Sequence, residues 1–208
     1  MALKGHSLIK VFIVFCSLLV LFNCKNTNKE ALTMADYSPV DISKISTDTV
    51  NILKIELRNG ICYYQNKPFS GFVEERYPNS TIKFIGSYLN GKLHGVSKTY
   101  FENGKLQAIR SYKENLSYGI HLGYWENGKP KFNYFYLNDK RVGYQKEWYE
   151  SGVLYRILNY VDDHEEGMQR AWRENGKLFI NYEIKDGVRY GLQKSALCYT
   201  LKNGKMLK

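Results

Sequence analysis

Short runs of apolar and aromatic residues alternate with polar turn residues along most of this chain, from about residue 60 to its end. The alternation is periodic, because a glycine recurs every 24 residues five times in succession. A degenerate half-unit at residues 63–70 precedes the first complete unit, and a divergent unit closes the chain, as terminal caps of a repeat array do. The phased glycines are Gly71, Gly95, Gly119, Gly143, Gly167 and Gly191.

Each unit contains two turn signals and therefore predicts one β-hairpin. The first signal is Asn-Gly, which tolerates positive φ at both central residues of a type I′ turn; Ser151-Gly152 takes its place in one unit. The second lies near Asn90-Gly91 and its equivalents, so that successive hairpins join into a meander. The Asn-Gly pairs that define the repeat are Asn103 and Gly104, Asn127 and Gly128, and Asn175 and Gly176.

Aromatic residues recur at fixed positions of the unit. The fifth residue after the glycine is Arg76 in the first unit and Tyr100, Tyr124, Trp148 or Trp172 in the next four, and the seventeenth is usually Tyr. Such residues favour a pleated, partly buried surface and can stack as ladders along a sheet. One interpretation is that they cover a thin sheet; the alternative is that Tyr100, Tyr124, Trp148 and Trp172 form an aromatic binding face. The predicted fold is all-β, an elongated open meander of 24-residue hairpins.

The N-terminal residues predict a targeting signal rather than part of the fold. An apolar run at residues 11–22 follows Lys4 and Lys10 and is shorter than the roughly 20 residues that a spanning helix needs. The run ends at Leu21-Phe22-Asn23-Cys24, which resembles a bacterial lipoprotein signal, although small residues are usual where Phe22 and Asn23 stand. The resemblance implies that Cys24 is acylated and becomes the mature N-terminus. An uncleaved anchor and a cleaved secretory signal are the alternatives.

This assignment divides the chain into three parts. Residues 1–23 are a signal peptide, expected to be helical, residues 24–55 a flexible polar tether, and residues 56–208 the repeat array. We therefore expect a lipid-anchored protein of the bacterial cell envelope, with the leaflet and membrane undetermined. Attachment through Cys24 would use more than one acyl chain, since one chain alone binds only marginally.

The chain has 208 residues, a net charge of +10 and 15% aromatic residues, a composition that excludes a disordered protein. Its Lys and Arg residues are distributed over repeated turns and form no continuous groove, and we expect no nucleic-acid partner. Binding to anionic lipid is a weaker possibility that would fall steeply with salt.

No arrangement of residues typical of catalysis is found. His94, His121 and His164 fall at three different phases of the repeat, and His94 is expected to serve a turn. The acidic cluster at residues 162–166 lacks calcium-loop spacing and is expected to be a solvated turn. Cys62 and Cys198 are about five hairpins apart, too far for a disulfide in an extended array. We expect no enzyme activity, no cofactor and no metal site.

One family resemblance follows from these residues. The segment Gly86-Ser-Tyr-Leu-Asn-Gly-Lys-Leu-His-Gly95, followed by Tyr100-Phe-Glu-Asn-Gly-Lys105, resembles the MORN repeat, and the 24-residue period is similar to its bacterial variant. The resemblance covers roughly residues 60–208. It implies an extended β-meander that serves as a binding surface. Proteins of this variant are commonly labelled YwqK-type antitoxins of toxin–antitoxin systems.

Two functions stay open at this point. The first is a non-enzymatic, membrane-anchored lipoprotein whose array binds an unidentified protein or another envelope component. The second is an antitoxin or immunity protein that neutralises a toxin by direct binding. An export signal is incompatible with a cytoplasmic toxin and leaves an immunity role in the envelope.

Overall fold

The computed structural model describes residues 32–192, 201–202 and 205–206. The predicted signal peptide and Cys24 lie outside the described residues. Short elements precede the repeats: the 3-10 helices η1 (Met34–Asp36) and η2 (Ile52–Lys54), and the strands β1 (Thr49–Asn51), β2 (Glu56–Arg58), β3 (Ile61–Tyr64) and β4 (Lys67–Pro68).

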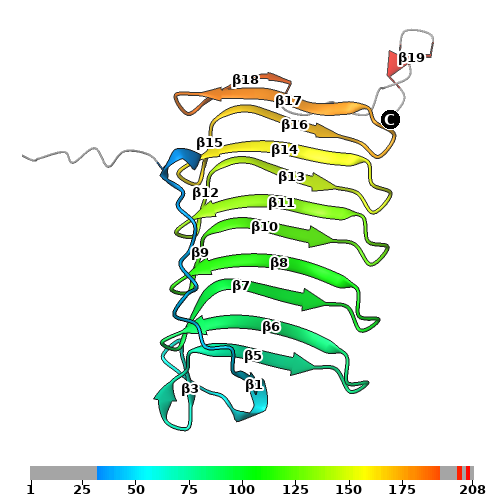
Figure 1. The fold of residues 1–208 in the computed structure, drawn as a ribbon. Coiled ribbons are helices and arrows are strands. Elements are labelled where there is room, and N and C mark those ends of the chain that lie inside the picture. The colour runs from blue at the N-terminus through cyan, green and yellow to red at the C-terminus, as the bar shows by residue number, and fades with distance from the viewer. Residues whose placement is uncertain (1–31, 193–200, 203–204, 207–208) are drawn as a thin grey trace, which may run out of the picture. The chain divides into compact units, whose positions relative to one another are not determined.

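The repeats, together with β1, form one large open sheet of 15 strands in which hairpins follow one another in chain order (Figure 1). Every neighbouring pair along the repeats is antiparallel, which confirms the all-β meander. The strands of the repeats are β5 (Gly71–Arg76), β6 (Ile82–Leu89), β7 (Lys92–Tyr100), β8 (Leu106–Lys113), β9 (Leu116–Ser117), β10 (Gly119–Tyr124), β11 (Pro130–Leu137), β12 (Lys140–Arg141), β13 (Gly143–Trp148), β14 (Leu154–Val161), β15 (His164–Glu165), β16 (Gly167–Trp172), β17 (Leu178–Lys185) and β18 (Val188–Leu192).

Three short pairings complete the topology. Strand β1 pairs with β5 in parallel and covers the N-terminal edge of the large sheet. Strands β2, β3 and β4 form a separate three-stranded sheet, and β19 (Leu201–Lys202) pairs with β20 (Lys205–Met206). The three-stranded sheet meets the repeats at the turn between β6 and β7, where the Cys62 amide donates to the Gly91 carbonyl at 2.8 Å.

The first turn of each repeat does not have the type I′ geometry that the sequence predicts for it. Asn103 does not have positive φ; only Gly104 does, at +79°. The Gly104 amide donates to the Phe101 carbonyl, as in a type I turn followed by a glycine bulge. The type I′ turns are instead the second turns, with positive φ at both central residues, as at Asn90 (+50°) and Gly91 (+77°). The prediction of type I′ geometry at Asn-Gly was therefore wrong, because the three-residue loop needs positive φ only at its last position.

The second turns also join neighbouring repeats. The amide of Asn115 donates to the Leu93 carbonyl at 2.8 Å, and the Asn115 side chain accepts from the Leu93 amide at 2.7 Å. Asp139 makes the same pair of bonds to Ser117 one repeat later. These turns favour Asn and Asp because both tolerate positive φ and also supply a side-chain acceptor.

The phased glycines stand at a corner of each repeat, and all six have φ between +69° and +150°. At this corner neighbouring hairpins separate. Strand β10 pairs with β11 along its length but with β8 only at Leu122 and Gly123. The corner therefore leaves backbone groups of β8 without a strand partner.

Side chains at the second position after the glycine replace those missing strand bonds. The Gln169 amide accepts from the Asn159 N–H and donates to the Asn159 carbonyl, both at 2.9 Å. Gln145 makes the equivalent pair with Phe135, at 3.0 and 3.1 Å. One primary amide carries both a donor and an acceptor, so it can take the place of a peptide group.

Residues 32–48, which we call the N-terminal strap, cross the repeats along this corner (Figure 1). Tyr37 packs on Phe135 with ring centroids 5.3 Å apart, and a Cβ at Gly119 would lie 3.2 Å from the Tyr37 ring. A Cβ at Gly95 would lie 3.0 Å from Ile42 in the same way. The first four phased glycines, from Gly71 to Gly143, thus form a groove in which the strap lies.

The strap differs from the flexible tether that the sequence predicts for residues 24–55. Leu32 and Val40 pack against a buried cluster of Tyr118, Phe135, Leu137 and Val142. The segment reads as polar because its apolar side chains are isolated in the sequence, yet Leu32, Tyr37 and Val40 all pack on the repeats. No helix among the described residues is long and apolar enough to cross a bilayer.

Candidate functional site

The three histidines make separate contacts. His94 is buried, and its Nε2 lies 3.0 Å from the Asp41 carbonyl of the strap. His121 is buried beside the Ser111 carbonyl, at 2.8 Å, and His164 contacts its own turn. Within the part of the chain that the structure describes, no group of three or more His, Cys, Asp or Glu residues could hold a metal ion.

His121 occupies the position of Gln145 and Gln169 and gives a pH prediction. Burial lowers the pKa of His121, opposed by its hydrogen bond to Ser111. The unfolded chain takes up this proton near pH 6.5, so the free energy of unfolding should fall as pH drops below that value toward the folded pKa. One proton limits this slope to about 1.4 kcal/mol per pH unit.

We expect His121→Gln to make urea unfolding less dependent on pH between pH 5 and 6.5, since glutamine cannot titrate. His164→Gln is the matched control, because His164 is exposed. An unchanged slope in His121→Gln would show that this imidazole takes up its proton equally well in the folded chain.

The aromatic residues predicted as a binding face lie at equivalent, half-buried places in successive repeats. No ring pair joins Tyr100, Tyr124, Trp148 and Trp172 to one another among the described residues. Equivalent positions are two strands apart, about 10 Å, which is too far for ring contact. Ring contacts arise instead between other positions, as between Phe132 and Tyr134 of one strand at 4.7 Å and between His121 and Tyr136 of one hairpin at 4.8 Å.

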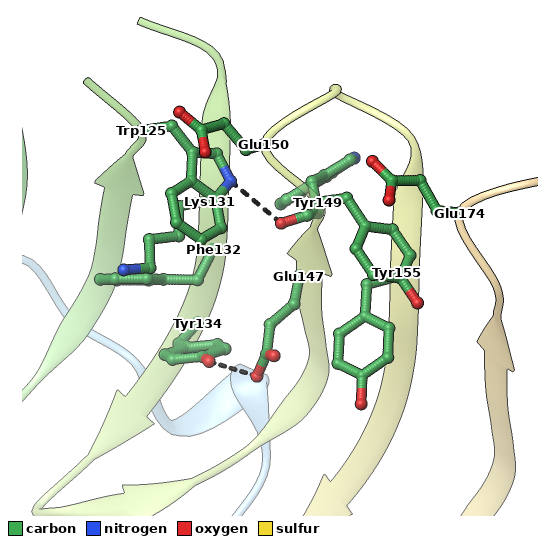
Figure 2. Close-up of a pocket in the computed structure, with 10 residues that line it drawn as sticks. Trp125, Lys131, Phe132, Tyr134, Glu147, Tyr149, Glu150, Tyr155 and Glu174 are labelled. Carbon is green, nitrogen blue, oxygen red and sulfur yellow. Dashed lines mark hydrogen bonds between the residues drawn. The ribbon is translucent and has the colours of Figure 1, made fainter. Parts of the chain in front are cut away.

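A hollow of about 540 Å³ lies between the third and fourth complete repeats (Figure 2). Tyr134 neighbours Phe135, and adjacent side chains of a strand point to opposite faces, so the hollow lies on the face opposite the strap. We call it the aromatic hollow. It is lined by Trp125, Lys131, Phe132, Tyr134, Glu147, Trp148, Tyr149, Glu150, Tyr155 and Glu174.

Two aromatic walls face each other in Figure 2. Phe132 and Tyr134 form the first, stacked with centroids 4.7 Å apart, and Trp125 continues it. Tyr149 and Tyr155 form the second, with centroids 5.0 Å apart and planes tilted by 55°. The Trp125 indole N–H donates to the Trp148 carbonyl at 3.1 Å and joins the two repeats.

Carboxylates lie between and above these walls. Glu147 Oε1 accepts from the Tyr134 hydroxyl and from Arg156 Nη2, the latter at 2.6 Å. Burial, with the bond to Glu147 next, raises the pKa of Tyr134, which therefore stays protonated and donates. Glu147 Oε2 and the side chains of Glu150 and Glu174 make no hydrogen bond or ion pair with the described residues.

The acidic cluster at residues 162–166 lies on a turn whose two aspartates form ion pairs with the preceding repeat. Lys140 contacts Asp162 at 2.6 Å and Arg141 contacts Asp163 at 2.5 Å. The Arg141 hydrogen bond holds the pKa of Asp163 below its usual range. Cys62 is a buried free thiol, and Cys198 lies outside the described residues.

The sequence predicted an aromatic face at the fifth position after each glycine, whereas two aromatic residues of the hollow stand at the sixth. Trp125 and Tyr149 stand at the sixth position after the glycine, and only Trp148 of the predicted face lines the hollow. Tyr100 lines a different hollow in earlier repeats. The available signal was the second aromatic of the pairs Tyr124-Trp125 and Trp148-Tyr149, which one face of a regular strand cannot accommodate together.

Two segments of the chain, residues 93–114 and 141–162, match the family model described as the MORN repeat variant. Each contains one phased glycine, Gly95 or Gly143, and most of the hairpin that follows it. A search of curated proteins found no match to the chain.

Proposed function

We propose that this chain of MORN repeat variants is a non-catalytic binding protein, anchored in the bacterial envelope through lipid on Cys24, and that its array binds a protein partner at the aromatic hollow. MORN repeats are a binding repeat type. The observation that carries the proposal is the aromatic hollow itself, where aromatic walls and carboxylates without a described partner meet on the face that the strap leaves uncovered.

The anchor rests on the residues before the array. A short apolar run ends at Cys24 and a polar segment follows at once, in the order of a lipoprotein signal. In the described part of the chain the strap begins at residue 32, close in sequence to Cys24. Lipid on Cys24 would therefore hold the repeats near the membrane surface.

Mass spectrometry and membrane fractionation of the full chain, beside Cys24→Ala, test the anchor. We expect a mature chain that begins at acylated Cys24 and that leaves the membrane fraction in the variant. A soluble, unprocessed chain would contradict the anchor and would favour the antitoxin role, to be tested by co-expression with a toxin.

Photo-crosslinking in cells tests the binding site. A crosslinking residue at Tyr155 should capture a protein, whereas one at Gln107, the same position two repeats earlier, should not. Equal capture from both positions would contradict the assignment of the aromatic hollow as the site.

A further inference from the structure

We propose that the aromatic hollow binds the cationic end of a lysine or arginine side chain in an extended basic segment of the partner. The inference rests on the proposed binding function and adds the chemistry of the partner. It is carried by the ring geometry, by the carboxylates and by the contacts of the chain's own cations.

The aromatic walls form a cage rather than a flat platform. Tyr149 and Tyr155 meet at a tilt of 55°, and Trp125 and Phe132 face them across the hollow (Figure 2). Ring faces that converge from several directions present their negative π surfaces to one point, which attracts an ammonium or guanidinium group. A sugar would instead stack on one open, flat ring face.

The rings at this site already bind cations of the chain itself. Lys131 Nζ lies 4.3 Å from the centroid of the Trp125 ring, and Arg156 Cζ lies 5.4 Å from that of Tyr155. Lys131 is exposed at the edge of the aromatic hollow. It can move aside at small cost, because it forms no ion pair among the described residues.

Carboxylates complete the recognition of a cation. Glu147 stands between the walls, and its Oε2 is free to accept a hydrogen bond from a ligand. Glu150 and Glu174 stand above the two walls in Figure 2. Three carboxylates and one cation, Lys131, line the aromatic hollow, although the whole chain is basic. Of the cations beside it, Arg156 is already bonded to Glu147, and Arg173 lies near Tyr149.

The volume fits a side chain with part of its backbone. About 540 Å³ is within the range of sites that bury small ligands, and it exceeds what one ammonium group needs. The hollow is open on the face away from the strap, so a peptide can cross it while one side chain enters.

Tryptophan fluorescence of the full chain in detergent micelles tests this inference, because Trp125 and Trp148 line the hollow. The probe is the peptide acetyl-Gly-Lys-Gly-Arg-Gly-amide. Its neutral counterpart carries acetyl-lysine and citrulline at the same places. We expect the basic peptide to bind at least fivefold more tightly than the neutral one. Equal affinity for the two peptides would overturn the proposal.

Variants of the hollow give opposite expected shifts. Glu150→Gln with Glu174→Gln should weaken binding of the basic peptide at least fivefold, whereas Glu102→Gln, at the same phase of an earlier repeat, should not change it. Lys131→Gln should tighten binding by about two- to fivefold, because it removes a competing cation. Glutamine already stands at the equivalent position 107.

Two results would refute the binding of a cationic side chain while the hollow remains a binding site. Binding of an N-acetylglucosamine trimer with no binding of the basic peptide would assign the aromatic hollow to a glycan. No response to the basic peptide, together with a protein crosslink from Tyr155, would refute the cationic side chain and keep the binding function. Loss of both signals would contradict both proposals.

Discussion

Replacing Leu137 by alanine is expected to lower the free energy of unfolding by about 2–5 kcal/mol, the range for removing a large aliphatic side chain from a core. Leu137 is 1% exposed and packs with Tyr118, Phe135 and Val142. Leu32 and Val40 of the strap cover the same cluster. The cavity would therefore weaken both the repeat and its contact with the strap.

Urea unfolding followed by tryptophan fluorescence measures this loss. Leu53→Ala is the control, because Leu53 is 90% exposed and should cost less than about 0.5 kcal/mol. Hydrogen exchange of the strap amides should rise in Leu137→Ala and stay unchanged in Leu53→Ala. If the two variants unfold alike, the buried cluster does not hold the strap.

Gln169→Leu is expected to cost about 3 kcal/mol, although it places an apolar side chain at a buried position. Gln169 is 0% exposed, and its amide bonds both to the Asn159 N–H and to the Asn159 carbonyl. Leucine leaves the Asn159 N–H without its acceptor, and an unsatisfied buried donor costs about 1–3 kcal/mol in addition to the lost hydrogen bonds. The Asn159 carbonyl keeps a bond from the Glu166 amide.

The Asn159 amide offers a local measurement of this effect. Its hydrogen exchange should accelerate in Gln169→Leu more than that of amides in β7 and β8, which lie in an earlier repeat. Gln107→Leu is the matched control, since Gln107 is exposed, and we expect a change within about 0.5 kcal/mol. Protection of Asn159 that survives in Gln169→Leu would mean that another group accepts its hydrogen bond.

The array was predictable because its signal repeats. Six glycines in phase, each with two turns, allow a hairpin meander and little else. The order of the strands follows, since short turns join only adjacent antiparallel strands. The same signal misassigned the turn types, because Asn-Gly serves both a two-residue type I′ turn and the last two positions of a three-residue loop.

The strap was not predictable from local composition. Residues 32–48 have neither a period nor a long apolar run, and their apolar side chains matter only because a groove of glycines lies beneath them. His94 was assigned to a turn for the same reason. Its contact with Asp41 joins residues 53 positions apart in the chain.

The aromatic hollow lies between these two cases. Its residues come from neighbouring repeats and belong to the periodic pattern. Which positions of the repeat face the hollow, however, depends on the bulge that shifts the strand register between Glu147 and Trp148. Beyond that bulge, alternation along a strand no longer identifies the face of a side chain. This is why Trp125 and Tyr149 were missed while Trp148 was found.

The sequence by itself determined the 24-residue hairpin and the order of the strands, because periodic glycines and turn residues act on their immediate neighbours. Only the tertiary structure decided how the glycine corners hold the strap, which amides close the gaps between hairpins, and which rings meet around the aromatic hollow. These features depend on distances between atoms far apart in the chain, and such distances follow from packing rather than from local propensity.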